Sequence, residues 1–150
     1  MKRLLVGAIC AVVGASAIAD EWHLVALSDT SAYLYDANSV QRDGKRIGAW
    51  VIVVLHPEHR SGDDYYLTWS EFDCQQKKTR DLDFYTKRPG VRISQARADA
   101  KWKRPIPGTM LDSLICSVCE KTSLDSFVAA NTDDLAANIR KHLKNIVNWE

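Results

Sequence analysis

The residues with the clearest potential for chemistry are Cys116 and Cys119, which are separated by two residues in the stretch LICSVCEK. Such a pair can be a redox-active dithiol, half of a zinc site, or part of a structural disulfide. A redox-active motif needs its first thiol at the N-terminus of a helix, where the helix dipole stabilises the thiolate. The apolar spacing before Cys116 predicts a helix that ends at the cysteines, so redox catalysis is disfavoured.

A zinc site built on these cysteines needs two further ligands, because structural zinc is bound by four. His56 and His59 are the candidates, in the polar stretch HPEHRSGDD. That stretch predicts a turn with no reason to approach the helix end, and cysteines of exported proteins usually oxidise. Covalent haem attachment needs a histidine after the second cysteine, where this chain has Glu120. We therefore predict no metal site and no cofactor.

The plainest interpretation is a structural disulfide from Cys74, at the end of a predicted strand, to one of the two cysteines. At about 100° per residue, Cys116 points away from the apolar stripe of the predicted helix, whereas Cys119 lies near its edge. Cys119 is therefore the better partner for Cys74. Such a bond would fix the helix on the sheet and leave Cys116 as the odd thiol.

The other groups suited to catalysis are the histidines and one pair of carboxylates. Asp81 and Asp83 share a face of a predicted strand and could act together, but their alternation with Leu82 and Phe84 is equally typical of a half-buried edge strand. His23 alternates with apolar strand residues, which favours a surface position. No nucleophile-elbow, phosphate-loop or metalloprotease motif accompanies them. We predict no catalytic residue and no enzymatic activity.

The elements that would position these side chains are mostly strands. Apolar and β-branched runs predict strands at residues 22–27, 32–35, 49–55, 65–74 and 79–85. Asp43-Gly44 predicts a tight hairpin, because both central residues of such a turn need a positive φ. The run at residues 49–55 is apolar on both faces, as expected for a central strand that is covered twice.

Two helices follow. Thr109 and Asp112 resemble a capping box before the apolar spacing of the first helix. Asn131 or Thr132 can cap a second helix at residues 133–147. The apolar stripe of this second helix consists of Leu135, Ile139, Leu143 and Ile146. We predict an α+β fold: an antiparallel β-sheet of about five or six strands, packed with C-terminal helices, with one structural disulfide.

The N-terminal residues 1–19 have the basic start, the apolar run and the small residues of a secretory signal peptide, cleaved before Asp20. The apolar run is shorter than the roughly 20 residues that span a bilayer, so we expect no transmembrane segment. Cys10 lacks the preceding small residue of a lipid-anchored cysteine, so no lipoprotein is predicted. Cleavage leaves 18 basic and 19 acidic residues, which argues against a nucleic-acid partner.

Positive charge gathers in residues 87–104, here called the basic segment, where Asp99 is the only acid. Its cations are Lys87, Arg88, Arg92, Arg97, Lys101, Lys103 and Arg104. A local positive field attracts an anionic partner even when the whole molecule is nearly neutral. The alternative is a solvated loop whose charges only maintain solubility. We take these seven residues as the candidate partner-binding site.

Several short signatures in order resemble the surface-adhesin protein E family of Gram-negative bacteria. They are Trp22, Tyr35-Asp36-x-x-Ser39-Val40, Ala49-Trp50-Val51, Glu71-Phe72-Asp73-Cys74, and Trp102-x-x-Pro105-Ile106-Pro107-Gly108-Thr109 running to Val118-Cys119. The resemblance implies an antiparallel sheet with helices, a structural disulfide, and adhesins that bind host matrix and serum proteins or, in some members, haem. The family's lipid-anchoring cysteine has no counterpart, and residues 120–150 extend beyond the match.

The sequence therefore divides into a signal peptide at 1–19, an adhesin-like domain at 20–119 and a helical extension at 120–150. The favoured function is a non-enzymatic, exported binding module, periplasmic or surface-associated, for a protein or an anionic polymer. By resemblance, the partner is a host matrix or serum protein or an anionic polysaccharide. The alternative is a periplasmic structural or assembly role through the C-terminal helix. More remote is metal or redox activity at Cys116 and Cys119.

Overall fold

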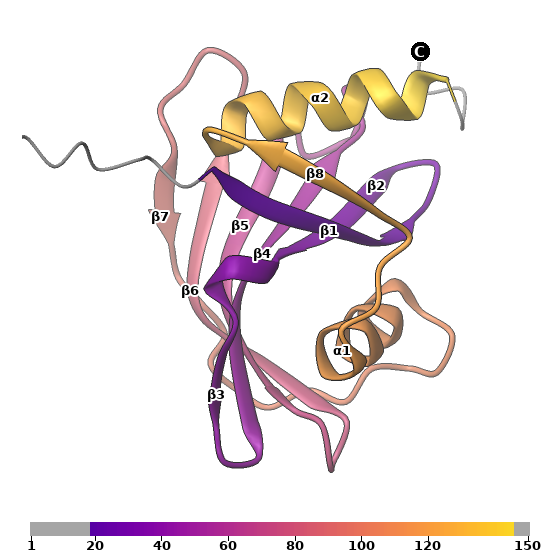
Figure 1. Cartoon of the computed structure of the whole chain (residues 1–150). Coiled ribbons are helices and arrows are strands. Elements are labelled where there is room, and N and C mark those ends of the chain that lie inside the picture. The colour runs from indigo at the N-terminus through magenta and orange to yellow at the C-terminus, as the bar shows by residue number, and fades with distance from the viewer. Residues whose placement is uncertain (1–18, 146–150) are drawn as a thin grey trace, which may run out of the picture.

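The computed structural model describes residues 19–145, which form one curved antiparallel sheet with a helix on each face (Figure 1). Residues 1–18 of the predicted signal peptide, with Cys10, lie outside the described residues, as does Ile146. The strands are β1 (Asp20–Leu27), β2 (Ser31–Asp36), β3 (Gln41–Asp43), β4 (Arg46–Leu55), β5 (Tyr65–Asp73), β6 (Lys78–Lys87), β7 (Ser94–Ala96) and β8 (Asp125–Ala129). The helices are the short 3₁₀ helix η1 (Ala37–Ser39), α1 (Met110–Glu120) and α2 (Thr132–Lys144).

The strand order is β7-β6-β5-β4-β2-β1-β8, and β3 pairs with the N-terminal part of β4. The predicted α+β class is confirmed, although the described sheet has eight strands in place of five or six. The two unexpected strands, β7 and β8, are short and lie at the two edges. The predicted hairpin after Asp43 is present, but its central residues are Gly44 and Lys45, and only Gly44 has a positive φ.

Strand β8 was not predicted, and it lies inside the helical extension proposed for residues 120–150. It pairs along β1, from Asp20 opposite Ala129 to Leu24 opposite Asp125. Without β8, β1 would be an edge strand with a row of unpaired backbone groups. The segment after α1 is therefore part of the same sheet.

Each face of the sheet has its own core, because successive side chains of a strand point to opposite faces. On one face, Ile52 and Val54 of β4 pack with Leu135 and Ile139 of α2. On the other face, Val51 packs with the buried side of α1, which consists of Leu114, Ile115 and Val118. Strand β4 is the central, doubly covered strand that its sequence predicts.

Helix α2 is fixed to its own sheet. Its apolar residues Leu135, Ile139 and Leu143 are completely buried. Arg140 adds a hydrogen bond to the carbonyl of Asp64 at 2.7 Å and an ion pair to the Asp64 carboxylate at 3.0 Å. The alternative of an assembly role through the stripe of this helix is therefore not supported, since its described members face the protein's own core.

Candidate binding surfaces

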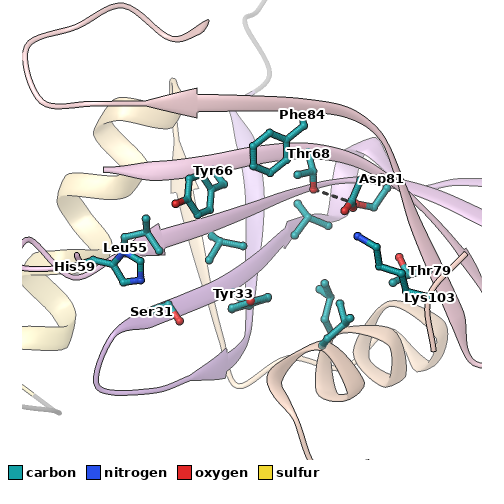
Figure 2. A pocket seen from close by; sticks show the side chains of 15 residues that line it. Ser31, Tyr33, Leu55, His59, Tyr66, Thr68, Thr79, Asp81, Phe84 and Lys103 are labelled. Atoms are coloured by element: carbon teal, nitrogen blue, oxygen red, sulfur yellow. Dashed lines mark hydrogen bonds between the residues drawn. The ribbon is translucent and has the colours of Figure 1, made fainter. Parts of the chain in front are cut away.

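A cavity of about 350 Å³ opens on the sheet face that carries α1, beside the N-terminal half of that helix (Figure 2). Helix α1 covers only part of this face, so side chains of the neighbouring strands remain accessible. Val51 and Val53 of β4 form an apolar floor, and Leu111 and Leu114 of α1 form one wall. The cavity is thus built from strands that are far apart in the sequence, and no local motif announces it.

The opposite wall is polar. The hydroxyl groups of Thr68 and Ser70 lie 2.9 Å apart, and Ser70 donates to Oδ1 of Asp81 at 2.7 Å. Thr68 and Ser70 are only 6% and 3% exposed, and their hydroxyl groups satisfy each other and Asp81 within the wall. Because the single proton of Ser70 goes to Asp81, Thr68 must donate to Ser70. The chain of bonds therefore ends at the Asp81 carboxylate.

A β-bulge in β6 determines which carboxylate enters the cavity. Asp81 pairs with Ser70, and Asp83 pairs with Trp69, so Leu82 is an extra residue without an opposite partner. Directly opposed residues share a face, which places Asp81 and Asp83 on opposite faces of the sheet. The prediction that they share a face is wrong for this reason, and they cannot act as paired carboxylates.

The aromatic residues of the cavity are Tyr33, Tyr66 and Phe84. The rings of Tyr66 and Phe84 lie 5.4 Å apart, and the bulge brings Phe84 to the face of Asp81. Burial raises the pKa of Tyr33, and the negative charge of Asp81 raises it further. Tyr33 therefore keeps its hydroxyl proton at neutral pH and remains a hydrogen-bond donor.

The basic segment runs through the β6–β7 hairpin and back along β6. It is anchored at three places: Lys87 is the last residue of β6, Ser94–Ala96 pairs with β6 as β7, and Lys103 exchanges backbone hydrogen bonds with Thr79 at 2.9 and 2.8 Å. Trp102, beside Lys103, is half-buried, with the guanidinium of Arg80 4.7 Å from its ring centroid. The residues between these anchors, and Arg104 after the last one, present their charges at the surface.

The seven cations of the basic segment are not equivalent. Lys87 pairs with Asp133 at 3.2 Å, Arg88 with Asp63 at 3.0 Å, and Lys103 with Asp99 at 3.3 Å. Two of these acids are distant in sequence, so counting charges within the segment missed them. The four that form no ion pair with a described residue are Arg92, Arg97, Lys101 and Arg104, and all are exposed.

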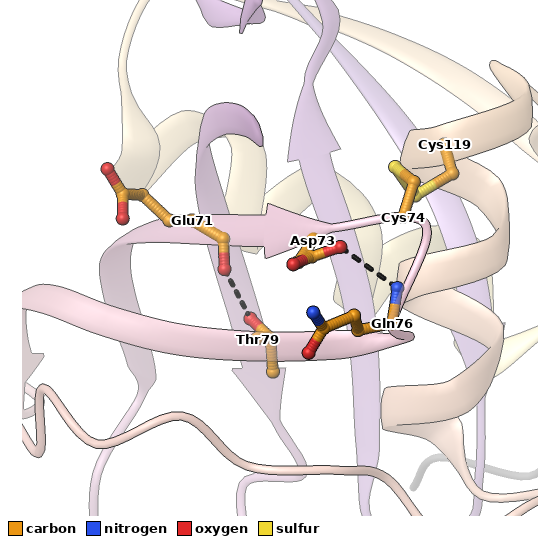
Figure 3. Close-up of a disulfide and its surroundings, with 6 residues drawn as sticks. All are labelled: Glu71, Asp73, Cys74, Gln76, Thr79 and Cys119. Atoms are coloured by element: carbon orange, nitrogen blue, oxygen red, sulfur yellow. Dashed lines mark hydrogen bonds between the residues drawn. A yellow bond between two sulfur atoms is a disulfide. The ribbon is translucent and has the colours of Figure 1, made fainter. Parts of the chain in front are cut away.

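Only one cysteine of the Cys116/Cys119 pair forms a disulfide. Cys119 is bonded to Cys74, with their Cα atoms 5.7 Å apart, and Cys116 is a free thiol (Figure 3). Beside the bond, the turn between β5 and β6 is fixed by Asp73, which accepts a hydrogen bond from the backbone N–H of Gln76 at 2.9 Å. Because Cys119 is committed, the two cysteines cannot form a reactive dithiol or two ligands of one zinc ion.

The histidines occupy structural or surface positions. His59 lies at the rim of the cavity, where its Nδ1 is 2.9 Å from the Ser61 hydroxyl. His23 is half-buried, with Nδ1 3.2 Å from the Tyr35 hydroxyl and Nε2 3.1 Å from Glu21. Between residues 19 and 145, no three His, Cys, Asp or Glu side chains gather in a group able to hold a metal ion.

The described residues thus present two candidate binding surfaces, the cavity beside α1 and the exposed cations of the basic segment. Residues 22–120 match the family model of surface-adhesin protein E, and the chain belongs to this family. A search of curated proteins gave no match. Family membership indicates an adhesin-like, exported or surface-located protein that binds an external partner and has a non-enzymatic role. Across residues 19–145, no helix has the length and apolar character needed to cross a membrane.

Proposed function

We propose that this protein is an exported, non-enzymatic module of the bacterial envelope that binds an anionic polymer through the basic segment. The observation that carries the proposal is the group of exposed, unpaired cations formed by Arg92, Arg97, Lys101 and Arg104. In this proposal residues 1–19 act as the signal peptide. The protein then works in the periplasm or at the cell surface.

The physical argument rests on how these charges are held. A cation that already has an acidic partner adds little to a new interaction, whereas an unpaired one retains its full attraction for a polyanion. Backbone pairing at both ends of the segment limits the conformational entropy lost when a partner binds. A polymer with repeated sulfate or carboxylate groups can contact several of these cations at once. The interaction should weaken steeply with salt, because the sites are exposed.

Heparin chromatography of the mature protein tests the proposal. The variant Arg97→Gln/Lys101→Gln/Arg104→Gln removes three unpaired cations and should elute at a clearly lower salt concentration than the wild type. The control Lys45→Gln/Lys141→Gln/Lys144→Gln makes the same change of charge at exposed sites outside the segment, and should elute close to the wild type.

Equal shifts in both variants would mean that retention follows net charge, and unchanged retention of the first variant would contradict the proposal outright. A protein partner with an acidic surface is the second candidate, because family membership indicates an external partner. If the same triple variant binds heparin normally but loses a host matrix or serum protein, that second candidate replaces the first.

A further inference from the structure

The cavity on the α1 face has no part in the proposed function, since Lys103 is the only residue of the basic segment that lines it. We propose that this cavity is a second, separate site, which binds a small organic cation with a primary ammonium head and an apolar or aromatic body. The ammonium group would bind to Asp81, and the body would lie along the apolar floor.

Asp81 is the residue that would bind the ammonium group. Its only hydrogen-bond donor among residues 19–145 is Ser70, and no described side chain forms an ion pair with it. A carboxylate has two oxygens and accepts several bonds, so most of the accepting capacity of Asp81 is unused. Since the hydroxyl protons of Ser70 and Thr68 are already used along their chain, a ligand or water can supply a further donor to Asp81.

The charge and the aromatic rings around Asp81 favour a cation over an anion or a neutral molecule. Among the described lining residues, Lys103 is the only lysine or arginine, and it forms its ion pair with Asp99 and none with Asp81. Figure 2 shows Tyr33, Tyr66 and Phe84 around the cavity, and aromatic faces attract cations. An anionic ligand would meet the Asp81 carboxylate without an unpaired cation nearby.

The size and the floor of the cavity determine the rest of the ligand. A volume of about 350 Å³ lies at the lower end of the range for small-molecule sites. Val51, Val53 and Leu111 offer apolar contact in the same cavity as the polar wall. A compact amine with one ring or a branched chain satisfies both regions, whereas a long polyamine would leave charges against the apolar floor.

Three probes with the same aromatic body separate the effect of charge from that of shape: 2-phenylethylamine, 2-phenylethanol and 3-phenylpropanoate. Each is titrated at neutral pH into the ¹⁵N-labelled mature protein, and amide chemical shifts are followed. The amine should give saturable shifts at Thr68, Ser70 and Asp81, the alcohol should bind at least about tenfold more weakly, and the anion should not saturate.

The bulge in β6 supplies a matched pair of variants. Asp81→Asn keeps the shape of the side chain and removes its charge, so it should weaken amine binding by at least about tenfold. Asp83→Asn makes the same change two residues away on the opposite face, and should change the affinity less than about twofold. Thermal unfolding of both variants confirms that each is folded.

The proposal is overturned if the amine gives no saturable shifts, if the anion binds as well as the amine, or if the two Asn variants behave alike. Heparin retention of the same samples keeps this result separate from the proposed function. Asp81→Asn should retain heparin as the wild type does, so either site can fail without the other.

Discussion

Removing the Cys74–Cys119 disulfide should lower the stability of the protein without unfolding it. The two cysteines are 45 residues apart, and closing a loop of this length stabilises a protein by about 4 kcal/mol in the chain-entropy model. Helix α1 would remain docked, because Leu114, Ile115 and Val118 are at most 2% exposed. We therefore expect Cys74→Ser/Cys119→Ser to lose about 4 kcal/mol of unfolding free energy and roughly 15 °C in melting temperature.

Urea unfolding of the mature protein, followed by tryptophan fluorescence without reductant, measures this loss. The dependence on urea should also steepen, because the unfolded chain without the crosslink exposes more surface. Cys116→Ser is the matched control, since it removes the free thiol, and should cost less than about 1 kcal/mol. A loss below about 1 kcal/mol in the double variant, or an equal loss in the control, would refute the reasoning.

Three further changes test the core by urea and pH titration. Ile139→Ala, at a completely buried position of α2, should lower the unfolding free energy by about 2–5 kcal/mol. The exposed control Asn138→Ala should lower it by less than about 0.5 kcal/mol. Similar losses in both variants would contradict the docking of α2. Tyr65→Phe removes the hydroxyl that donates to Asp133 at 2.8 Å and should cost about 1–2 kcal/mol. Burial raises the pKa of Tyr65 from 10.0 to about 12, so the stability of the wild type should hold below pH 10 and fall toward pH 12. The stability of the Phe variant should fall less over this range. An equal loss of stability in the two proteins would contradict this reasoning. Gly48→Ala would bring a Cβ to 2.7 Å from Cζ2 of Trp69 and should cost about 1–3 kcal/mol, with a changed near-ultraviolet dichroism spectrum; an unaltered spectrum and stability would contradict this close contact.

The features that sequence reasoning predicted well are those encoded within a few neighbouring residues. The side chain of Thr109 accepts from the N–H of Asp112, as the capping pattern indicates, and the helix begins at the next residue, Met110. The apolar run of β4 identified the central strand because burial on both faces leaves no polar alternation. The helical wheel selected Cys119 over Cys116 correctly, because both lie on one regular helix.

The features it missed depend on pairing between distant strands. The alternation of Asp81 and Asp83 suggested one shared face, and only the register against β5 reveals the extra residue Leu82. Strand β8 is five residues long and mostly exposed, so its pattern is weak until β1 is known to need a partner. The cavity combines β2, β4, β5, β6 and α1, a juxtaposition that exists only after folding.

The ion pairs of the basic segment could not be predicted from the sequence for a related reason. Residues 87–104 contain a single acid, yet Asp63 and Asp133 approach from other elements and pair with Arg88 and Lys87. Of the seven candidate partner-binding residues, the proposal therefore keeps the four cations that form no ion pair with a described residue. The proposed anionic partner still rests on a local excess of positive charge.

The most direct test of the central claim is to map where a heparin oligosaccharide contacts the mature protein, by amide chemical shifts in a titration at low salt. The account predicts saturable shifts concentrated between residues 92 and 104, lost when salt is raised enough to screen exposed charges. Shifts spread over the lysines of α2 or over the β3–β4 hairpin, or no saturable shifts at all, would contradict the claim that the basic segment is the partner-binding surface.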